Sequence, residues 1–507
     1  MIILIMGLIP LVGSIVVGAL PASRVLLAKQ ITLAASIATL GVAIGMGVAF
    51  EANSAERFQF TLSTEWIRSF GSSFALGVDG IALVLIALVA VLVPAVVLAS
   101  WHEQAPGQRS PKVFFALLLL LEVMLIGVFS ATDVLLFYVF FEAMLVPMYF
   151  LIGSFGGPRR QYAAVKFFLY SLLGGLLMLA AVIGLYVSAG KGTFAFESLI
   201  GAISDSNTQK LLFLGFFIAF AIKAPLVPFH TWLPDAGAEA PIGGAALLVG
   251  VLDKVGTFGF IRYCLPLFPD ASRYFAPMVL VLSVIGILYA ALLAMGQQDM
   301  KRLVAYTSIA HFGFIGLGIF AFTTQGMSGA VFYMVNHGLS TGALFLVIGV
   351  LIARGGSRMV ADYGGVAKVA PMLGGVFLLA GLSSLALPGM STFISEFLVL
   401  VGTFTRHKAY AAVATVGIIF AAIYILQLVQ RTMHGPAIEK VKAFKDLSGR
   451  EAWALAPLLA LVIFLGIYPK PVLDVITPAV QRTMQDAHQS DPAPTVGVTA
   501  EQKAGNR

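Results

Sequence analysis

The chain has 507 residues, of which 59% are hydrophobic and 11% are charged, with a formal net charge of +7 and a single cysteine. Soluble domains carry about 25% charged residues, so this composition indicates an integral membrane protein. A single thiol can form neither an intrachain disulfide nor a four-cysteine iron–sulfur cluster. No P-loop, GxGxxG or HExxH motif is present, so we expect no redox centre, cofactor site or metal site in the chain. The positive charge forms no stripe of the kind that binds nucleic acid.

Fourteen apolar segments are long enough to cross a bilayer, which takes about 20 residues. The first lacks a positively charged flank and is therefore predicted to be a spanning helix, not a cleaved signal peptide. The segments lie at 2–20, 31–50, 78–100, 113–131, 133–153, 162–189, 211–229, 241–265, 275–296, 301–322, 328–353, 371–404, 409–432 and 451–470. The sequence thus predicts an all-α polytopic membrane protein with about 14 transmembrane helices.

A faint internal repeat relates helices 4–8 to helices 9–13. Asp133 lies 166 residues before Asp299, and AVKFFLYSLLGG from Ala164 aligns with AVFYMVNHGLST from Ala330 at the same offset. Five helices is an odd number, so the second copy would enter the membrane from the opposite side, as in transporters with inverted repeats. We therefore predict helices 1–3 over 1–112, repeats over 113–265 and 275–432, a C-terminal helix region over 451–483 and a disordered polar tail over 484–507.

Loop charges predict the orientation of the chain. If the N-terminus lies outside, the inner loops carry about twice as many Lys and Arg residues as the outer loops. This bias favours both termini outside a bacterial cytoplasmic membrane.

Helix 7 is interrupted in AFAIKAPLVPFHTWLPDAGAEAP, which runs from Ala219 to Pro241. Pro225 and Pro228 lack an N–H group, so they free backbone carbonyls that must face protein or water. Lys223 precedes this break and His230 follows it. Helix 12 is predicted to break similarly at Pro388–Gly389. A lysine beside such a break either reaches the membrane surface or occupies a hydrated pocket where its charge is functional.

Other ionisable residues in the spanning segments cost free energy to insert into a membrane, so such residues are usually paired, hydrated or functional. Glu142 is either a protonated buried carboxyl or one half of an ion pair with a lysine. Neighbouring helix residues point about 100° apart, so Asp253 and Lys254 need not pair with each other. The histidines are either packed and neutral or part of a proton relay. The candidate residues are Glu142, Lys223, His230, Asp253, Lys254, His311, His337 and Glu396, with Glu122 and Lys166 as weaker members.

Several motifs around these residues resemble one family closely over nearly the whole chain. They are FEAMLVP at Glu142, IKAPLVPFHTWLPDA at Lys223, DKVGTFGFIR at Lys254, AHFGF at His311, NHGLSTGALF at His337 and FISEF at Glu396. The chain resembles the antiporter-like proton-translocating subunits of respiratory NADH:quinone oxidoreductase (complex I). Its glutamate in helix 12 makes the chain most similar to subunit M, the relative of mitochondrial chain 4. Gly237 and Asp253 depart from the family pattern, which often has a histidine and an apolar residue there.

The resemblance implies a non-redox subunit that moves protons along Glu142, Lys223, Lys254, the two histidines and Glu396. It implies other membrane-arm subunits as partners, including neighbouring antiporter-like subunits, with NADH, flavin, iron–sulfur clusters and quinone held elsewhere in the complex. Three alternatives stay open: a subunit of a multi-subunit sodium/proton antiporter, the membrane arm of a hydrogenase-type complex, and a structural anchor with inert ion pairs.

Overall fold

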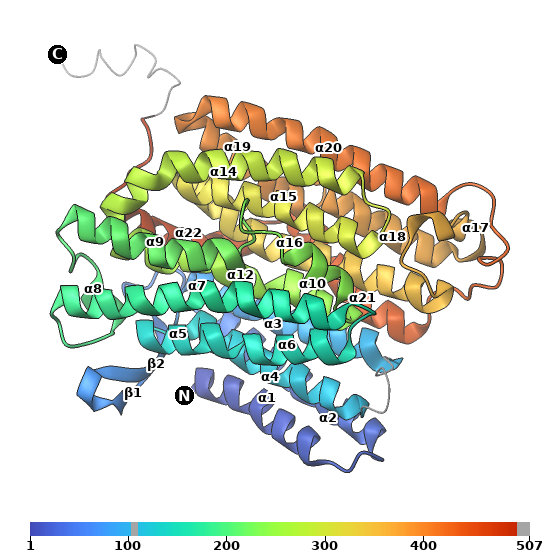
Figure 1. The fold of residues 1–507 in the computed structure, drawn as a ribbon, viewed down its shortest axis with the longest axis horizontal. Coiled ribbons are helices and arrows are strands. Elements are labelled where there is room, and N and C mark those ends of the chain that lie inside the picture. The colour runs from blue at the N-terminus through green and yellow to red at the C-terminus, as the bar shows by residue number, and fades with distance from the viewer. Residues whose placement is uncertain (103–109, 494–507) are drawn as a thin grey trace.

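The computed structural model describes residues 1–102 and 110–493, and most of them form helices that lie side by side along one direction (Figure 1). Twelve helical segments of the described chain are long and apolar enough to span a membrane. They are α1 (Ile2–Ala19), α2 (Val25–Ala49), α3 with its 3-10 extension η2 (Gly80–Ala99, Ser100–His102), α4 (Pro111–Ser130), α5 with α6 (Val134–Ala143, Leu145–Phe155), α7 (Arg160–Ala189), a composite helix over Ile242–Leu267, α14 (Pro269–Met295), α15 (Met300–Phe320), α16 (Thr324–Gly355), α20 (Lys408–Met433) and α21 (Gly449–Ile467).

The two remaining expected helices are the ones that the sequence predicts to be broken. Helix 7 consists of α9 (Ser206–Lys223) and α10 (Leu233–Glu239), and helix 12 consists of α18 (Pro371–Ser384) and α19 (Ser391–Arg406). At the first break the indole N–H of Trp232 donates to the carbonyl of Ile222 over 2.8 Å. Pro225 cannot donate to the carbonyl of Ala221, so the N–H of Leu226 donates there instead over 2.9 Å, and the indole serves the Ile222 carbonyl that Leu226 would reach in a regular helix.

A β-hairpin departs from the all-α prediction. Strands β1 (Gln59–Ile67) and β2 (Ser72–Val78) pair antiparallel, with Thr64 opposite Phe74. Polar and apolar side chains alternate in QFTLSTEWI, a pattern that favours a strand. The segment lies between two spanning helices, where the search for long apolar runs predicted no element. The hairpin lies at the same end of the molecule as α8 (Phe196–Leu199) in Figure 1.

Two matching helix starts support the inverted repeat. Asp133 and Asp299 each cap the N-terminus of a helix through a side-chain oxygen, and each forms an isolated β-bridge, to Ala195 and to Met359. Asp133 lies beside the hairpin, since the backbone N–H of Ser73 donates to it over 3.0 Å. Asp299 lies at the opposite end, with α10 and α17 (Val366–Val369) (Figure 1). The short 3-10 turns η1 (Arg68–Phe70) and η5 (Val360–Asp362) complete the fold.

The C-terminal region contains two helices instead of the expected single one over 451–483. The chain turns after α21, and α22 (Lys470–Asp486) packs on α3 and α16 with Ile476 and Val480 buried. An ion pair of 2.7 Å between Arg57 and Asp486 holds the end of α22. The expected disordered tail begins within α22, and its residues 494–507 lie outside the described part of the chain.

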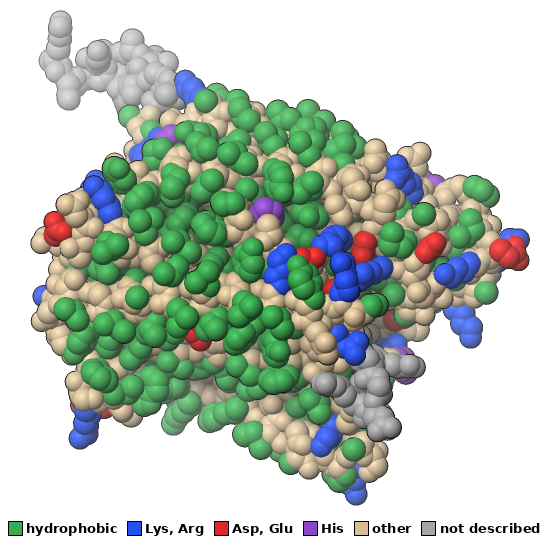
Figure 2. Space-filling model, in the orientation of Figure 1, with side chains coloured by type: hydrophobic (Ala, Val, Ile, Leu, Met, Phe, Trp, Pro, Cys, Tyr) green, Lys and Arg blue, Asp and Glu red, His purple; other side chains and the backbone are tan. Residues whose placement is uncertain are grey.

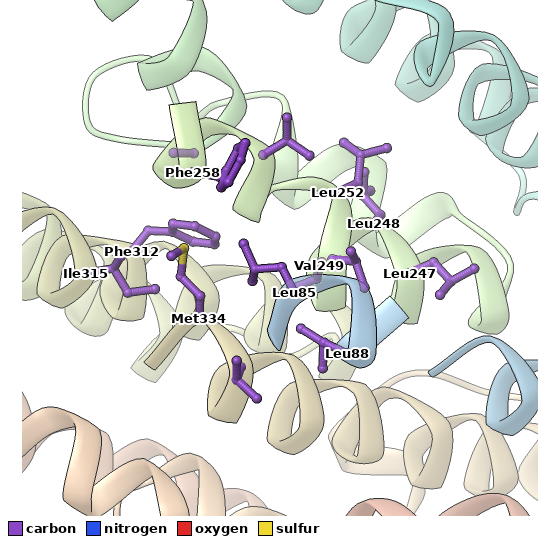
Figure 3. Packing of buried hydrophobic residues seen from close by; sticks show 14 of the residues in the cluster. Leu85, Leu88, Leu247, Leu248, Val249, Leu252, Phe258, Phe312, Ile315 and Met334 are labelled. Carbon is purple, nitrogen blue, oxygen red and sulfur yellow. The ribbon is translucent and has the colours of Figure 1, made fainter. Parts of the chain in front are cut away.

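The composite helix 8 runs through the centre of the protein. It contains α11 (Ile242–Leu247), the π-helical segment η3 (Leu248–Leu252), α12 (Lys254–Gly259), a second π-helical segment η4 (Phe260–Cys264) and α13 (Leu265–Leu267). Side chains from α3, α15 and α16 surround it, as Figure 3 shows. They include Leu85, Leu88, Phe312, Ile315 and Met334. On the outer face, hydrophobic side chains form a broad band (Figure 2), as a surface exposed to lipid or to other spanning helices requires.

Candidate functional site

Lys254 occupies the centre of the apolar interior and is fully buried. Its ammonium group lies 3.0 Å from Oδ1 of Asp253 and 2.7 Å from Nδ1 of His337, and it also donates to the carbonyl of Val249. Val249 belongs to η3, where the wider π-helical turn shifts the backbone bonds to a spacing of five residues. The lysine therefore has three acceptors within an otherwise apolar shell.

Asp253 and Lys254 form a direct ion pair, although their positions in sequence gave no reason to expect one. Asp253 lies between η3 and α12 and keeps helical backbone angles, with φ −67° and ψ −24°, and the long side chain of Lys254 still reaches its Oδ1 over 3.0 Å. Both side chains are fully buried. The sequence left open whether the two residues pair, and the structure pairs them.

The two predicted histidines lie next to each other. His337 in α16 contacts Lys254, and its ring centroid is 5.1 Å from that of His311 in α15. Nδ1 of His311 lies 2.5 Å from the hydroxyl of Tyr333, which sits one helical turn before His337. The sequence prediction omitted Tyr333, because a tyrosine in an apolar helix is usually a packing residue. Its spacing of four residues from His337 was the available signal.

Glu396 lies in α19, beyond the break in helix 12, and is nearly fully buried. Its nearest electrostatic neighbours include Tyr333 and Tyr424. The side-chain amide of Asn336, in α16, donates to Oγ of Ser395 over 2.6 Å. This bond fastens α19 to α16 beside His337, so the break does not leave Glu396 loosely placed.

Lys223 is the last residue of α9 and is fully buried. Its ammonium group lies 4.8 Å from the ring centroid of Phe141 and 5.7 Å from that of Phe167, and no described residue forms a hydrogen bond with it. The lysine does not snorkel to the surface. It sits in an aromatic box beside the helix break.

Glu142 in α5 is the carboxylate whose charge acts on Lys223, but no ion pair within 4.0 Å joins them in the described chain. Its carboxylate fills the space beside Gly175 of α7, where an added Cβ would lie 1.7 Å from Oε1. Glu142 is half-buried, and its Oε1 is buried without a hydrogen-bond partner among the described residues. The structure thus places the predicted pair as electrostatic neighbours rather than as a direct contact.

His230 lies apart from the other candidates. Its ring packs 5.3 Å from Tyr289, and its charged neighbour is Lys166. Lys166 in turn forms an ion pair of 2.7 Å with Asp235, which also binds Arg302. These residues make a separate charged group at the end of the molecule that carries α10.

Glu122 is also buried, in α4, and neither of its carboxylate oxygens has a hydrogen-bond partner among the described residues. The main buried line therefore runs through Asp253, Lys254, His337, His311 and Tyr333 towards Glu396.

Polar groups in a line at the centre of inverted, broken-helix repeats define a membrane protein of the antiporter-like class. Residues 131–421 match the family described as NADH:quinone oxidoreductase/Mrp antiporter, TM. The chain is 51% identical to NADH-quinone oxidoreductase subunit M of Mycobacterium tuberculosis, over 97% of this chain and 95% of the relative. It is 39% identical to NADH-ubiquinone oxidoreductase chain 4 of Arabidopsis thaliana, over 94% of this chain and 96% of that protein.

A solved structure gives the same result. Respiratory complex I from Thermus thermophilus with bound NADH contains a chain that superposes with a TM-score of 0.87 at 32% identity, over 96% of this chain and 100% of that one. The chain belongs to the subunit M family of NADH-quinone oxidoreductase, the antiporter-like, proton-translocating membrane subunits of complex I that lack redox centres. This membership confirms the resemblance read from the sequence and separates the chain from the antiporter and hydrogenase alternatives.

Proposed function

We propose that this chain moves protons through two connected groups of buried residues, Glu142 with Lys223 and the line from Asp253 to Glu396. The observation that carries the proposal is the contact of 2.7 Å between the Lys254 ammonium and Nδ1 of His337, deep in an apolar core. A charge in such a place is costly, and a direct contact with a histidine provides a route for its proton.

Loading begins at Lys223. Because no described residue forms a hydrogen bond with the ammonium, the electrostatic attraction of Glu142 is the main interaction that favours its charged form. Glu142 is half-buried, so a neighbouring subunit can change its charge or position. When that attraction weakens, Lys223 releases its proton towards Lys254.

Transfer continues at Lys254, whose charge Asp253 stabilises. The proton passes to His337, then to the adjacent ring of His311, and leaves by way of Glu396. Each group sits on a different helix, α12, α16, α15 and α19, so small changes in helix packing alter the contacts between them.

Electron transfer takes place in other subunits of the complex, which hold the NADH site, flavin, iron–sulfur clusters and quinone. Neighbouring antiporter-like subunits contact this chain within the bilayer of a bacterial cytoplasmic membrane. The positive-inside rule supports a cytoplasmic position for the end that carries Arg159, Arg302 and Arg358, and with it an outside position for both termini.

The test is proton pumping driven by NADH in membrane vesicles that contain the assembled complex with Lys223→Ala. We expect pumping and NADH-driven quinone reduction to fall together, at least tenfold. Lys210→Ala is the matched control, because Lys210 lies on the same helix but stacks on Tyr274 at the membrane surface. Full pumping by assembled Lys223→Ala would refute the scheme.

A further inference from the structure

Tyr333 occupies a position between the histidine pair and Glu396 that the proposed route leaves unassigned. Resting on the proposed function, we infer that the Tyr333 hydroxyl is a proton-relay group that connects His311 to Glu396. The tyrosine is fully buried, and its hydroxyl lies 2.5 Å from Nδ1 of His311. A hydroxyl both donates and accepts a hydrogen bond, as a relay between two titratable groups requires.

The histidine pair directs a proton to this hydroxyl. His337 uses Nδ1 for Lys254 and His311 uses Nδ1 for Tyr333, which leaves the two Nε2 atoms without hydrogen-bond partners. The rings are 5.1 Å apart between centroids and no hydrogen bond joins the two Nε2 atoms, so the proton crosses between the rings through a water molecule. It then leaves His311 from the only nitrogen that has a partner.

The register of α16 against α19 places Glu396 beside Tyr333. The amide of Asn336 bonds to Oγ of Ser395, and further outward Gly329 packs against the backbone of Leu398 and Val399. These two contacts bracket the pair of residues on both helices.

The electrostatic effect of Glu396 on the tyrosine agrees with this register. Asn336 therefore acts as a positioning residue, because it fixes the half-helix that carries the acceptor.

The transfer step conserves charge on the tyrosine. Protonated His311 gives its Nδ1 proton to the Tyr333 oxygen, while the hydroxyl's own proton moves to one water molecule, which passes a proton to a carboxylate oxygen of Glu396. One N–H bond and two O–H bonds break, and three O–H bonds form. Tyr333 is neutral before and after the step, so the phenolate, costly in an apolar site, never accumulates.

Tyr333→Phe removes only the hydroxyl and keeps the ring that packs against His311. In assembled complex we expect NADH-driven proton pumping to fall at least tenfold. Tyr263→Phe is the matched control, since it also removes a buried hydroxyl, one that donates to the Ala131 carbonyl away from the histidines, and it should pump within twofold of wild type. Pumping within twofold of wild type by Tyr333→Phe would overturn the inference.

A second measurement covers the case in which Tyr333→Phe does not assemble. Incorporating a fluorinated tyrosine at position 333 keeps the shape and the hydrogen bond but makes the hydroxyl more acidic. A relay hydroxyl predicts a changed pumping rate at constant pH, because the O–H bond of Tyr333 breaks and re-forms in the step, whereas a packing role predicts an unchanged rate and would refute the inference.

Lys254→Ala separates this inference from the wider scheme. If Lys254→Ala pumps normally, the proposed line itself is wrong; if it is inactive while Tyr333→Phe is normal, only the tyrosine step is wrong.

Discussion

Asp253→Asn should slow proton transfer through Lys254 without changing the shape of the site. The two charges are 3.0 Å apart and fully buried, so at an effective dielectric constant of about 20 their interaction is about 5 kcal/mol. Removing one partner of a buried pair costs about 3–5 kcal/mol in practice. The Val249 carbonyl and His337 still accept from the ammonium, so we take about 2 kcal/mol as the uncompensated part. That energy corresponds to a roughly 30-fold slower transfer.

The assay is the rate at which NADH builds a pH gradient in inverted membrane vesicles, followed with a pH-sensitive dye and normalised to the amount of assembled complex. NADH-driven quinone reduction is measured in parallel, because a coupled pump slows in both. Asp253→Asn combined with Lys254→Met removes both charges, and removing both partners of a buried pair is often neutral or stabilising. We expect this double variant to assemble well and still not pump. A wild-type pumping rate in assembled Asp253→Asn would refute the reasoning.

Three further substitutions test neighbouring features. Gly175→Ala adds a Cβ that would lie 1.7 Å from Oε1 of Glu142, so the carboxylate must move and NADH-driven pumping should fall severalfold. Trp232→Phe removes the donor to the Ile222 carbonyl at the helix break and should lower the thermal stability of the purified complex by about 1–3 kcal/mol in free energy, with unchanged stability contradicting the capping role. Partial burial acts to raise the pKa of Asp446, but the backbone N–H groups that donate to its carboxylate hold that pKa below its ordinary value. The carboxylate therefore stabilises the fold at neutral pH, and this stability is lost as the pH falls through the lowered pKa. The melting temperatures of wild type and Asp446→Asn should converge in acid.

The sequence predicted the parts of the site that an apolar background makes visible. A lysine such as Lys223 or Lys254 is easily recognised within an apolar spanning helix, because a charge in that position has few structural explanations. The proline pair predicted the break in helix 7 for a comparable reason, since a missing N–H group has a defined local effect. These signals are local in sequence, so they needed no knowledge of which helices are neighbours.

Contacts between helices were harder to predict. The Asp253–Lys254 pair directly follows a π-helical turn at 248–252, whose sequence, LVGVL, gives no sign that it differs from an ordinary apolar helix. The contact between the Tyr333 hydroxyl and His311 depends on the packing of α15 against α16, which the sequence does not show. The β-hairpin was missed because apolar length was the search criterion, and its strands alternate polar and apolar side chains instead.

The helix 7 break also bears on whether the buried charges are structural. A lysine at a helix C-terminus often caps the last carbonyls. Here backbone N–H groups and the Trp232 indole serve the carbonyls of that turn, and the ammonium of Lys223 makes no hydrogen bond to any described residue. Its contacts are the faces of Phe141 and Phe167, and such cation–π contacts are worth about 0.5–2 kcal/mol. Burying the charge costs more than that, at least about 2.5 kcal/mol in the middle of a membrane. The aromatic contacts alone do not offset this cost, so the charged form of Lys223 depends on the attraction of Glu142, an arrangement that suits a proton carrier better than an inert anchor.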